Sequence, residues 1–234
     1  MAECWAAFMG DCDELSREHY FSHGLLPEIV SVEGPSWANG KTLKLSRKSL
    51  TAKCLCKKHN SELSILDKGA IVFHNAMDSI KKAMDDPDSS KIGWHIVDGK
   101  KLLQWCCKTI AGIHAMENQV APDFITHSAF DQNAAALLGF SPIVSENTSL
   151  QHLDGHIGFC QYIHEHDTSI VFYSIVLANM AFFVFPSIQS HAQGIFHNMV
   201  HSGRLMDRMK TLTVTNKFPQ YSGRHKSRVL HFQW

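Results

Sequence analysis

The chain has 234 residues and a formal net charge of zero, because 22 basic side chains balance 22 acidic ones when histidine is counted as neutral. With 44% hydrophobic and 19% charged residues it can bury a sizeable core, which excludes a disordered tail. The balanced charge also argues against a uniformly positive surface for non-specific nucleic-acid binding, so any basic surface must be local.

Cysteine usage and hydropathy bear on the compartment. Seven cysteines is an odd number, and the N-terminal residues MAECWAAFMG lack a basic segment leading into an apolar one, which argues against a secreted disulfide framework. The most apolar stretch, residues 170–186, is shorter than the roughly 20 residues that span a bilayer. These features predict a cytoplasmic protein with no membrane segment.

The first half of the chain predicts short strands and loops followed by helices. Residues 1–60 contain turn formers and short apolar runs. Apolar residues then recur at spacings of three and four from residue 61, which predicts an amphipathic helix ending near Asp85-Asp86-Pro87. A polar linker at residues 85–90, a helix over residues 100–117 and a short third helix over residues 129–140 are expected next.

The second half predicts strands. From about residue 156 the segments IGFCQYI, SIVFYSIVL, AFFVFPS, TLTVT and SRVLHFQW are rich in β-branched and aromatic residues. A turn at residues 177–180 divides the most apolar stretch into a hairpin. These strands indicate an antiparallel sheet, which would suit a homo-oligomer contact or a regulatory protein partner.

Positive charge is concentrated in two segments. Six basic residues and no acid lie between residue 208 and the C-terminus. Seven more lie between Glu33 and Glu62, again with no acid. Such segments contact nucleic-acid phosphates or form solvated faces, and the sequence favours neither reading. The candidate nucleic-acid-binding residues are Lys41, Lys44, Arg47, Lys48, Lys53, Lys57 and Lys58.

Cysteine and histidine residues gather in the loop-rich N-terminal segment. Cys56-x-x-His59 has the spacing of a zinc knuckle, because two intervening residues let a tight turn bring a thiolate and an imidazole to one ion. Cys4 and Cys12 can complete a structural zinc site, with Cys54 as the substitute candidate. The alternative is that these are small buried thiols and an incidental histidine.

This arrangement resembles the zinc-braced HNH nucleases, also called His-Me finger or ββα-metal nucleases. The resemblance covers residues 4–84, in particular ELSREHYFSHGLLPEI and LCKKHNSELSILD. It implies that His19 is the general base of phosphodiester hydrolysis and that Glu18 and Asn60 hold a catalytic Mg²⁺ or Mn²⁺ ion. Cys4, Cys12, Cys56 and His59 would hold the bracing zinc.

The chemistry of these residue types agrees with those roles. A neutral imidazole is a suitable base near pH 7, and a hard cation prefers carboxylate and amide oxygens. Asn60 stands where many family members have a histidine, and His74-Asn75 is a further candidate that the helix pattern places towards solvent. A degenerate module that binds nucleic acid or a protein without cutting is the alternative function.

Three other motifs are assigned structural roles. His164-Glu165-His166-Asp167 is expected to form a polar hairpin turn, and Cys106 is expected to pack in the core. The segment from Trp94 to Lys108 predicts a strand, an Asp-Gly turn and a helix that serve as scaffold. The sequence has no P-loop, dinucleotide-binding or G-x-S-x-G motif.

Together these features predict an α+β protein in two parts. Residues 1–86 would form an HNH-like, zinc-braced ββα-metal module, and residues 91–234 a helical region followed by an antiparallel β-sheet domain. The expected function is metal-dependent endonuclease activity on nucleic acid, with DNA as the expected substrate and, by association with the family, a role in microbial or phage defence.

Overall fold

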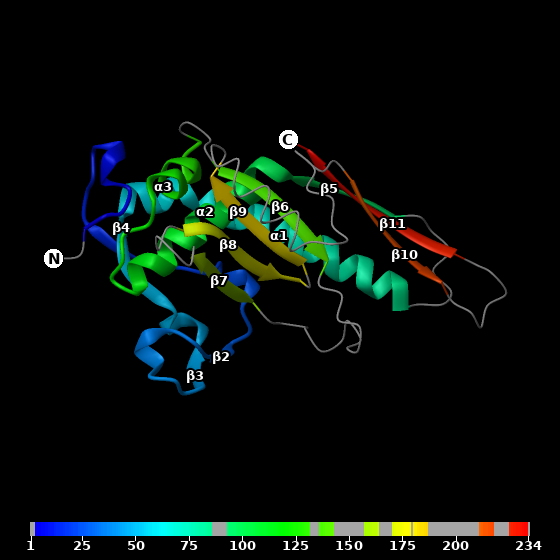
Figure 1. Cartoon of the computed structure of the whole chain (residues 1–234), viewed down its shortest axis with the longest axis horizontal. Helices are drawn as coiled ribbons and strands as arrows, with labels where there is room; N and C mark the ends of the chain where they lie inside the picture. Colours follow the sequence, from blue (N-terminus) through cyan, green and yellow to red (C-terminus); the bar gives the residue numbers. More distant parts are fainter. Residues whose placement is uncertain are drawn as a thin grey trace.

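The computed structural model describes residues 3–85, 93–131, 136–142, 157–163, 170–178, 180–186, 211–217 and 225–233. Helices and mainly antiparallel sheets are both present in these ranges, so the α+β class is confirmed (Figure 1). The linker was expected at residues 85–90; Asp85 is the last residue of the first long helix, and residues 86–90 lie outside the described residues, as does the motif at residues 164–167.

Two antiparallel strands and a long helix organise the N-terminal third. Strand β1 (Leu15–His19) pairs with β4 (Thr51–Cys56), and α1 (Lys57–Asp85) follows β4 without a loop. The connection between the two strands carries a second hairpin, β2 (Ile29–Val32) with β3 (Leu43–Ser46). Four 3-10 turns complete this region: η1 (Ala7–Met9), η2 (His23–Leu25), η3 (Ser36–Ala38) and η4 (Arg47–Ser49).

Helix α1 confirms the predicted amphipathic pattern. Its buried side chains recur every three or four residues and include Leu63, Leu66, Ala70, Phe73 and Ile80. The helix begins at Lys57, four residues before the predicted start at residue 61. The earlier start places His59 in the first helical turn rather than in a separate loop.

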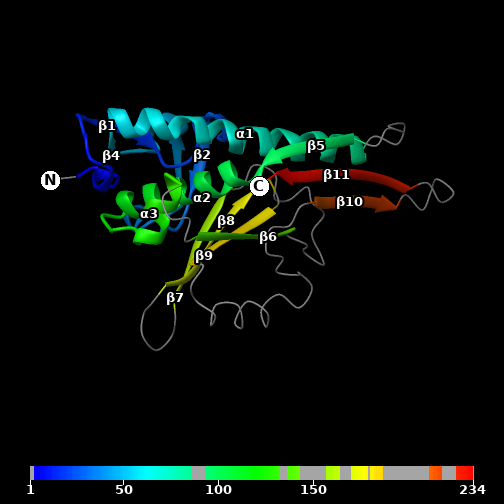
Figure 2. The same cartoon turned by 90° about the horizontal axis from the view of Figure 1, so that it is seen from above.

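Helix α2 (Gly99–Met116) lies at the centre of the molecule. It follows β5 (Gly93–Asp98), and the Asp98 carboxylate caps it by accepting a hydrogen bond from the Lys101 backbone N–H at 2.9 Å. This confirms the predicted strand and helix, but the helix follows the strand directly at Asp98-Gly99 with no separate turn. Figure 2 shows α2 between α1 and the four-stranded sheet, and Trp105 and Cys106 are fully buried there.

The remaining strands form two sheets rather than one. Strands β6 (Ala136–Pro142), β9 (Met180–Pro186), β8 (Ile170–Leu177) and β7 (Gly158–Ile163) pair antiparallel in that order. Strand β10 (Thr211–Lys217) pairs antiparallel with β11 (His225–Gln233), which pairs parallel with β5. The predicted hairpin turn at residues 177–180 is confirmed by the pairing of Leu177 with Met180.

The third helix predicted over residues 129–140 is wrong. Helix α3 (Asp123–Ala129) ends where that helix was expected to begin, and β6 starts at Ala136. Alanine and leucine favour a helix locally, but Gly139 and Pro142 weaken one, and pairing with β9 supplies backbone hydrogen bonds that an isolated short helix cannot match.

One hydrophobic core joins α1, α2 and the four-stranded sheet. Phe73 of α1 contacts Phe182 of β9 with ring centroids 5.0 Å apart. The core thus contains residues from both sides of the boundary expected near residue 86, and the division into two domains stays a prediction.

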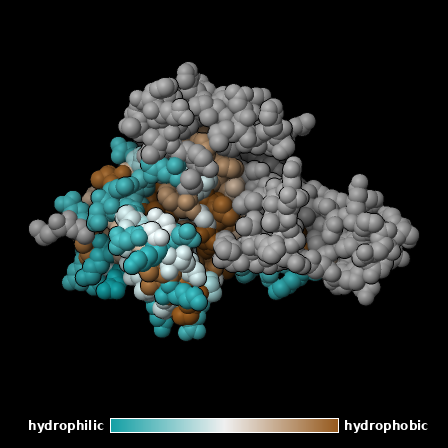
Figure 3. All heavy atoms as spheres, turned by 60° about the horizontal axis from the view of Figure 1, so that its bottom comes forward, coloured by the Kyte–Doolittle hydropathy of each residue, from teal (hydrophilic) through white to brown (hydrophobic). Residues whose placement is uncertain are grey.

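Of the helices in the described ranges, none has the length and apolar character needed to cross a bilayer. In the view of Figure 3, the described N-terminal surface is mainly hydrophilic around a central apolar patch.

Candidate metal centre

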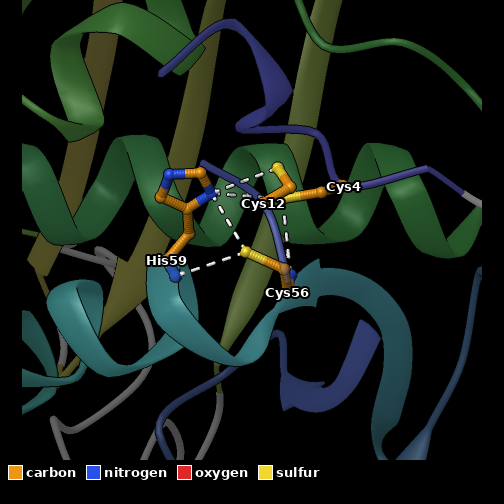
Figure 4. A group of neighbouring side chains, drawn as sticks. All are labelled: Cys4, Cys12, Cys56 and His59. Atoms are coloured by element: carbon orange, nitrogen blue, oxygen red, sulfur yellow. Dashed lines mark hydrogen bonds between the residues drawn. The ribbon is translucent and has the colours of Figure 1, made fainter. Parts of the chain in front are cut away.

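Four predicted ligands meet where β1, β4 and α1 come together. The ligand atoms of Cys4, Cys12, Cys56 and His59 all lie within 4.8 Å of one another (Figure 4). The His59 Nδ1 atom is 3.5 Å from Cys4 Sγ, 3.7 Å from Cys12 Sγ and 3.2 Å from Cys56 Sγ. A tetrahedral ion with sulfur and nitrogen ligands at about 2.0–2.3 Å separates its ligand atoms by about 3.5 Å, so the cluster can hold a metal ion and is compatible with zinc.

The strand-to-helix junction produces the local half of the cluster. Cys56 is the last residue of β4, and its sulfur lies 3.5 Å from the backbone N–H of His59 in the first turn of α1. This is the position of a helix N-cap, whose side chain accepts a hydrogen bond from an N–H that has no partner within the helix. The Cys-x-x-His spacing therefore places both ligands on one side of the helix start.

Strand pairing brings the distant half. The backbone N–H of Trp5 donates to Cys54 O at 3.0 Å, and that of Lys57 donates to Glu14 O at 2.9 Å. These bonds align residues 4–14 with the end of β4, so that Cys4 Sγ accepts a hydrogen bond from the Cys56 N–H at 3.3 Å. Cys54 is buried nearby but does not belong to the cluster, so the structure selects Cys4 and Cys12 over this substitute candidate.

The thiols differ in acidity. Desolvation raises the pKa of Cys4, and desolvation together with the neighbouring Cys4 sulfur raises the pKa of Cys12 to about 12. Desolvation also acts on Cys56, but hydrogen bonds from backbone N–H groups, including that of His59, outweigh it and lower the pKa of this thiol. Cys56 is thus the thiol best prepared to be a thiolate before a metal ion arrives.

Aromatic rings cover the cluster. The Phe130 ring, just after α3, lies 5.6 Å from the His59 ring and 5.9 Å from that of Trp5. Phe8 adds edge contacts with Phe130 and with His127 of α3. Because these rings exclude water from one side and connect α3 to residues 4–8, loss of the cluster's geometry would also weaken the docking of α3.

A second polar group lies on the inner face of β1, where Glu18 and Lys108 are buried and Asp67 is partly exposed. The Lys108 ammonium of α2 is 2.6 Å from Glu18 Oε1 and 2.8 and 3.0 Å from the two carboxylate oxygens of Asp67 on α1. Ser22 Oγ donates to Asp67 at 2.5 Å and accepts a hydrogen bond from Trp105 Nε1 at 2.7 Å. This network joins β1, α1 and α2. Desolvation raises the pKa of Glu18, and the Lys108 charge opposes that rise.

His19 ends β1 on the opposite face from Glu18, since successive strand residues alternate. Its Nε2 atom is buried and has no hydrogen-bond partner among the described residues, and its ring lies 5.1 Å from that of His23. Desolvation, helped by the neighbouring charges of His23 and Lys108, lowers the pKa of His19. This shift favours the neutral imidazole, and no described residue hydrogen-bonds its Nε2 atom.

Both predicted Mg²⁺ ligands have polar partners among the described residues. The side-chain amide of Asn60 donates to Ser16 Oγ at 3.0 Å and to Arg17 O at 3.5 Å, while one oxygen of Glu18 holds Lys108. A divalent cation needs free oxygen donors around it. These contacts use the Asn60 N–H groups and one Glu18 oxygen, so the obstacle to a divalent ion beside Glu18 is repulsion by the Lys108 ammonium, 2.6 Å from Glu18 Oε1.

The predicted basic residues fall into two groups. Arg47 donates to Leu26 O at 3.1 Å, and Lys57 and Lys58 pair with Glu14 and Asp11. The other four lie exposed at the surface: Lys41, Lys44, Lys48 and Lys53.

Three residues at the site were missed by sequence reasoning. Lys108 ends a segment that was assigned only a scaffold role, and Asp67 is the last residue of the LCKKHNSELSILD segment, in which the resemblance gave it no role. A lysine within the apolar face of α2 was the available signal, because a lysine is almost never buried without a partner. The third is Arg17, an exposed residue that pairs in register with Lys53 across β1 and β4.

Two further sequence candidates lie away from the cluster. His74 is half-buried and Asn75 exposed on α1, so only the asparagine faces solvent as expected. Cys106 is fully buried, as predicted.

Comparisons with protein-family models, curated proteins and solved structures found no match to this chain.

Proposed function

We propose that this protein is a zinc-braced ββα nuclease that hydrolyses phosphodiester bonds of nucleic acid, with DNA as the expected substrate and His19 as the general base. The observation that carries the proposal is the position of His19. Its imidazole, whose Nε2 atom has no hydrogen-bond partner among the described residues, ends the strand that pairs with β4 near a four-residue cluster able to hold a metal ion.

Zinc is the metal that suits the brace, by which we mean the cluster of Cys4, Cys12, Cys56 and His59. Three thiolates and one imidazole around one ion are typical of a closed structural zinc site, and three of the four residues are buried while Cys12 is exposed. The site has no open position for a substrate, so its role is to hold β1 against the start of α1. Any chemistry falls to residues beyond the brace.

Positive charge beside His19 supports an anionic substrate. Arg17 and His19 share one face of β1, and Lys53 stands directly across from Arg17. Two cations paired in register repel each other and destabilise the sheet. A phosphate bound between them would relieve this repulsion and bring the backbone of a nucleic acid to the end of β1.

In this proposal His19 removes a proton from a water molecule that attacks the phosphorus, which requires that the Nε2 atom, buried in this structure, becomes accessible when substrate binds. The lowered pKa of His19 keeps the base unprotonated at neutral pH. The Lys108 ammonium beside Glu18 would repel the expected Mg²⁺ or Mn²⁺ ion, and no step is assigned to that ion.

The test is cleavage of supercoiled plasmid, single-stranded DNA and RNA by zinc-loaded protein, without added divalent ion and with Mg²⁺ or Mn²⁺. Replacing His19 with alanine is expected to abolish cleavage while zinc content and the circular dichroism spectrum stay unchanged. His74→Ala is the matched control, because that half-buried histidine lies on α1 away from the cluster. Equal cleavage by wild type and His19→Ala would refute the assignment of the base.

Binding without cleavage is the second candidate, and the Glu18–Lys108 ion pair favours it because it fills the place expected for a catalytic ion. In that case His19→Ala leaves nucleic-acid affinity intact, and no condition gives cutting. Arg17→Gln with Lys53→Gln is then expected to lower the affinity and to reduce the salt slope by about two, one for each lost phosphate contact.

A further inference from the structure

Lys108 is an unusual residue for its position. Its side chain is only 3% exposed, yet it comes from α2, a helix whose neighbouring residues Trp105 and Cys107 are fully buried. A buried ammonium strongly destabilises a protein unless charged groups surround it. The protein thus retains a cation at a place where an apolar side chain would pack more easily.

The contacts of Lys108 account for its whole donor capacity. An ammonium group has three hydrogens, and three carboxylate oxygens lie within 3.0 Å: one from Glu18 and two from Asp67. No donor remains for a substrate. Lys108 therefore acts through the two carboxylates and not by direct contact with a ligand.

The carboxylates of Glu18 and Asp67 carry two negative charges, and Lys108 neutralises one of them. Without the lysine, Glu18 and Asp67 would approach each other as a pair of anions with oxygen donors, which is the kind of site that a hard divalent cation prefers. With the lysine, the net charge of the three side chains is reduced by half, and Glu18 Oε1 is already paired with the ammonium.

We propose that the Lys108 ammonium is the resident cation of this site and excludes a divalent metal ion from Glu18 and Asp67. The inference depends on the nuclease proposal only for the expectation that an ion belongs beside Glu18. In this arrangement α2, which lies outside the ββα unit, determines whether the site accepts Mg²⁺ or Mn²⁺.

Mn²⁺ binding tests this directly, because it needs no nuclease activity. Zinc-loaded protein is titrated with Mn²⁺, and free Mn²⁺ is followed by electron paramagnetic resonance. Lys108→Met is expected to bind Mn²⁺ at least about tenfold more tightly than wild type, since a unit positive charge has been removed next to the carboxylates. Lys101→Met on the same helix removes an exposed lysine paired with Asp98 and should behave as wild type.

Two further variants separate charge from packing. Glu18→Gln combined with Lys108→Met removes both partners and should lose the gain in affinity. Lys108→Arg keeps the charge and should exclude Mn²⁺ as the wild type does. The proposal is overturned if Lys108→Met binds Mn²⁺ no more tightly than Lys101→Met.

A measurement on the wild-type protein covers the case in which Lys108→Met does not fold. The indole N–H of Trp105 is linked to Asp67 through Ser22, so a paramagnetic ion bound at Asp67 would broaden its nuclear magnetic resonance signal. The signal is expected to persist at one equivalent of Mn²⁺. Broadening at substoichiometric Mn²⁺ would overturn the proposal, whereas an absence of nucleic-acid cleavage would refute the nuclease assignment alone.

Discussion

Replacing Cys56 with serine separates metal binding from helix capping. Serine is a good N-cap residue, so the hydrogen bond with the backbone N–H of His59 can be kept while the thiolate is lost. The matched control is Cys54→Ser, because Cys54 is buried on the same strand, two residues away, and does not belong to the cluster. Both changes convert a buried thiol to a hydroxyl, so they differ mainly in metal binding.

The expected size of the effect follows from linkage between binding and folding. A zinc concentration 1,000 times the dissociation constant stabilises the folded state by about 4 kcal/mol. In a chain of this length each kcal/mol shifts the melting temperature by roughly 2–4 °C, so loss of zinc should lower it by roughly 8–16 °C. The change removes one of four ligands, which is enough to open the tetrahedral site.

The assay combines zinc content with thermal unfolding, each with and without a chelator. Wild type and Cys54→Ser are expected to hold one zinc per chain and to melt at lower temperature after chelation. Cys56→Ser is expected to hold none, to melt near the chelated wild type and to be insensitive to the chelator. Zinc retained in Cys56→Ser and lost in Cys54→Ser would refute the assignment of ligands made from the structure.

Three other outcomes are expected. Zinc affinity should fall as the pH is lowered from about 8 to 6, because two of the thiols have raised pKa values and must release protons to bind the ion; zinc titrations in a set of buffers measure this. The cleavage rate should fall only when the pH drops below the ordinary pKa of histidine, because the pKa of His19 is lowered. A pH–rate profile in which the rate already falls above the ordinary histidine pKa would contradict this. Phe73→Ala should destabilise the fold by about 3–5 kcal/mol in denaturant unfolding, whereas Val72→Ala, at a residue that is 52% exposed, should change stability little.

Sequence periodicity identified the elements whose pattern is local. The apolar residues of α1 recur every three or four positions, and burial in the structure follows that pattern. Helix α2 is buried on every side over residues 105–114, because it packs between α1 and the four-stranded sheet. The helix expected over residues 129–140 did not form, because its helix-favouring composition is local whereas the partners of β6 in β9 lie 38 to 50 positions away in the chain. Strand pairing of this kind cannot be read from a local window.

The metal cluster shows the same division. The spacing of Cys56 and His59 by itself determined half of the site, because two ligands three residues apart are brought together by a single turn of backbone. Only tertiary structure decided that Cys4 and Cys12 join them while Cys54 does not, since that choice depends on how residues 4–14 align with the end of β4.

The buried ion pairs were decided by tertiary structure alone. Glu18, Asp67 and Lys108 come from β1, α1 and α2, and no spacing in the sequence relates them. The sequence determined that a lysine would fall on the apolar face of α2, but not which acids would neutralise it. That was settled by the packing of α2 against α1 and β1, because a buried charge must find its partners among whatever groups the fold places within hydrogen-bond distance.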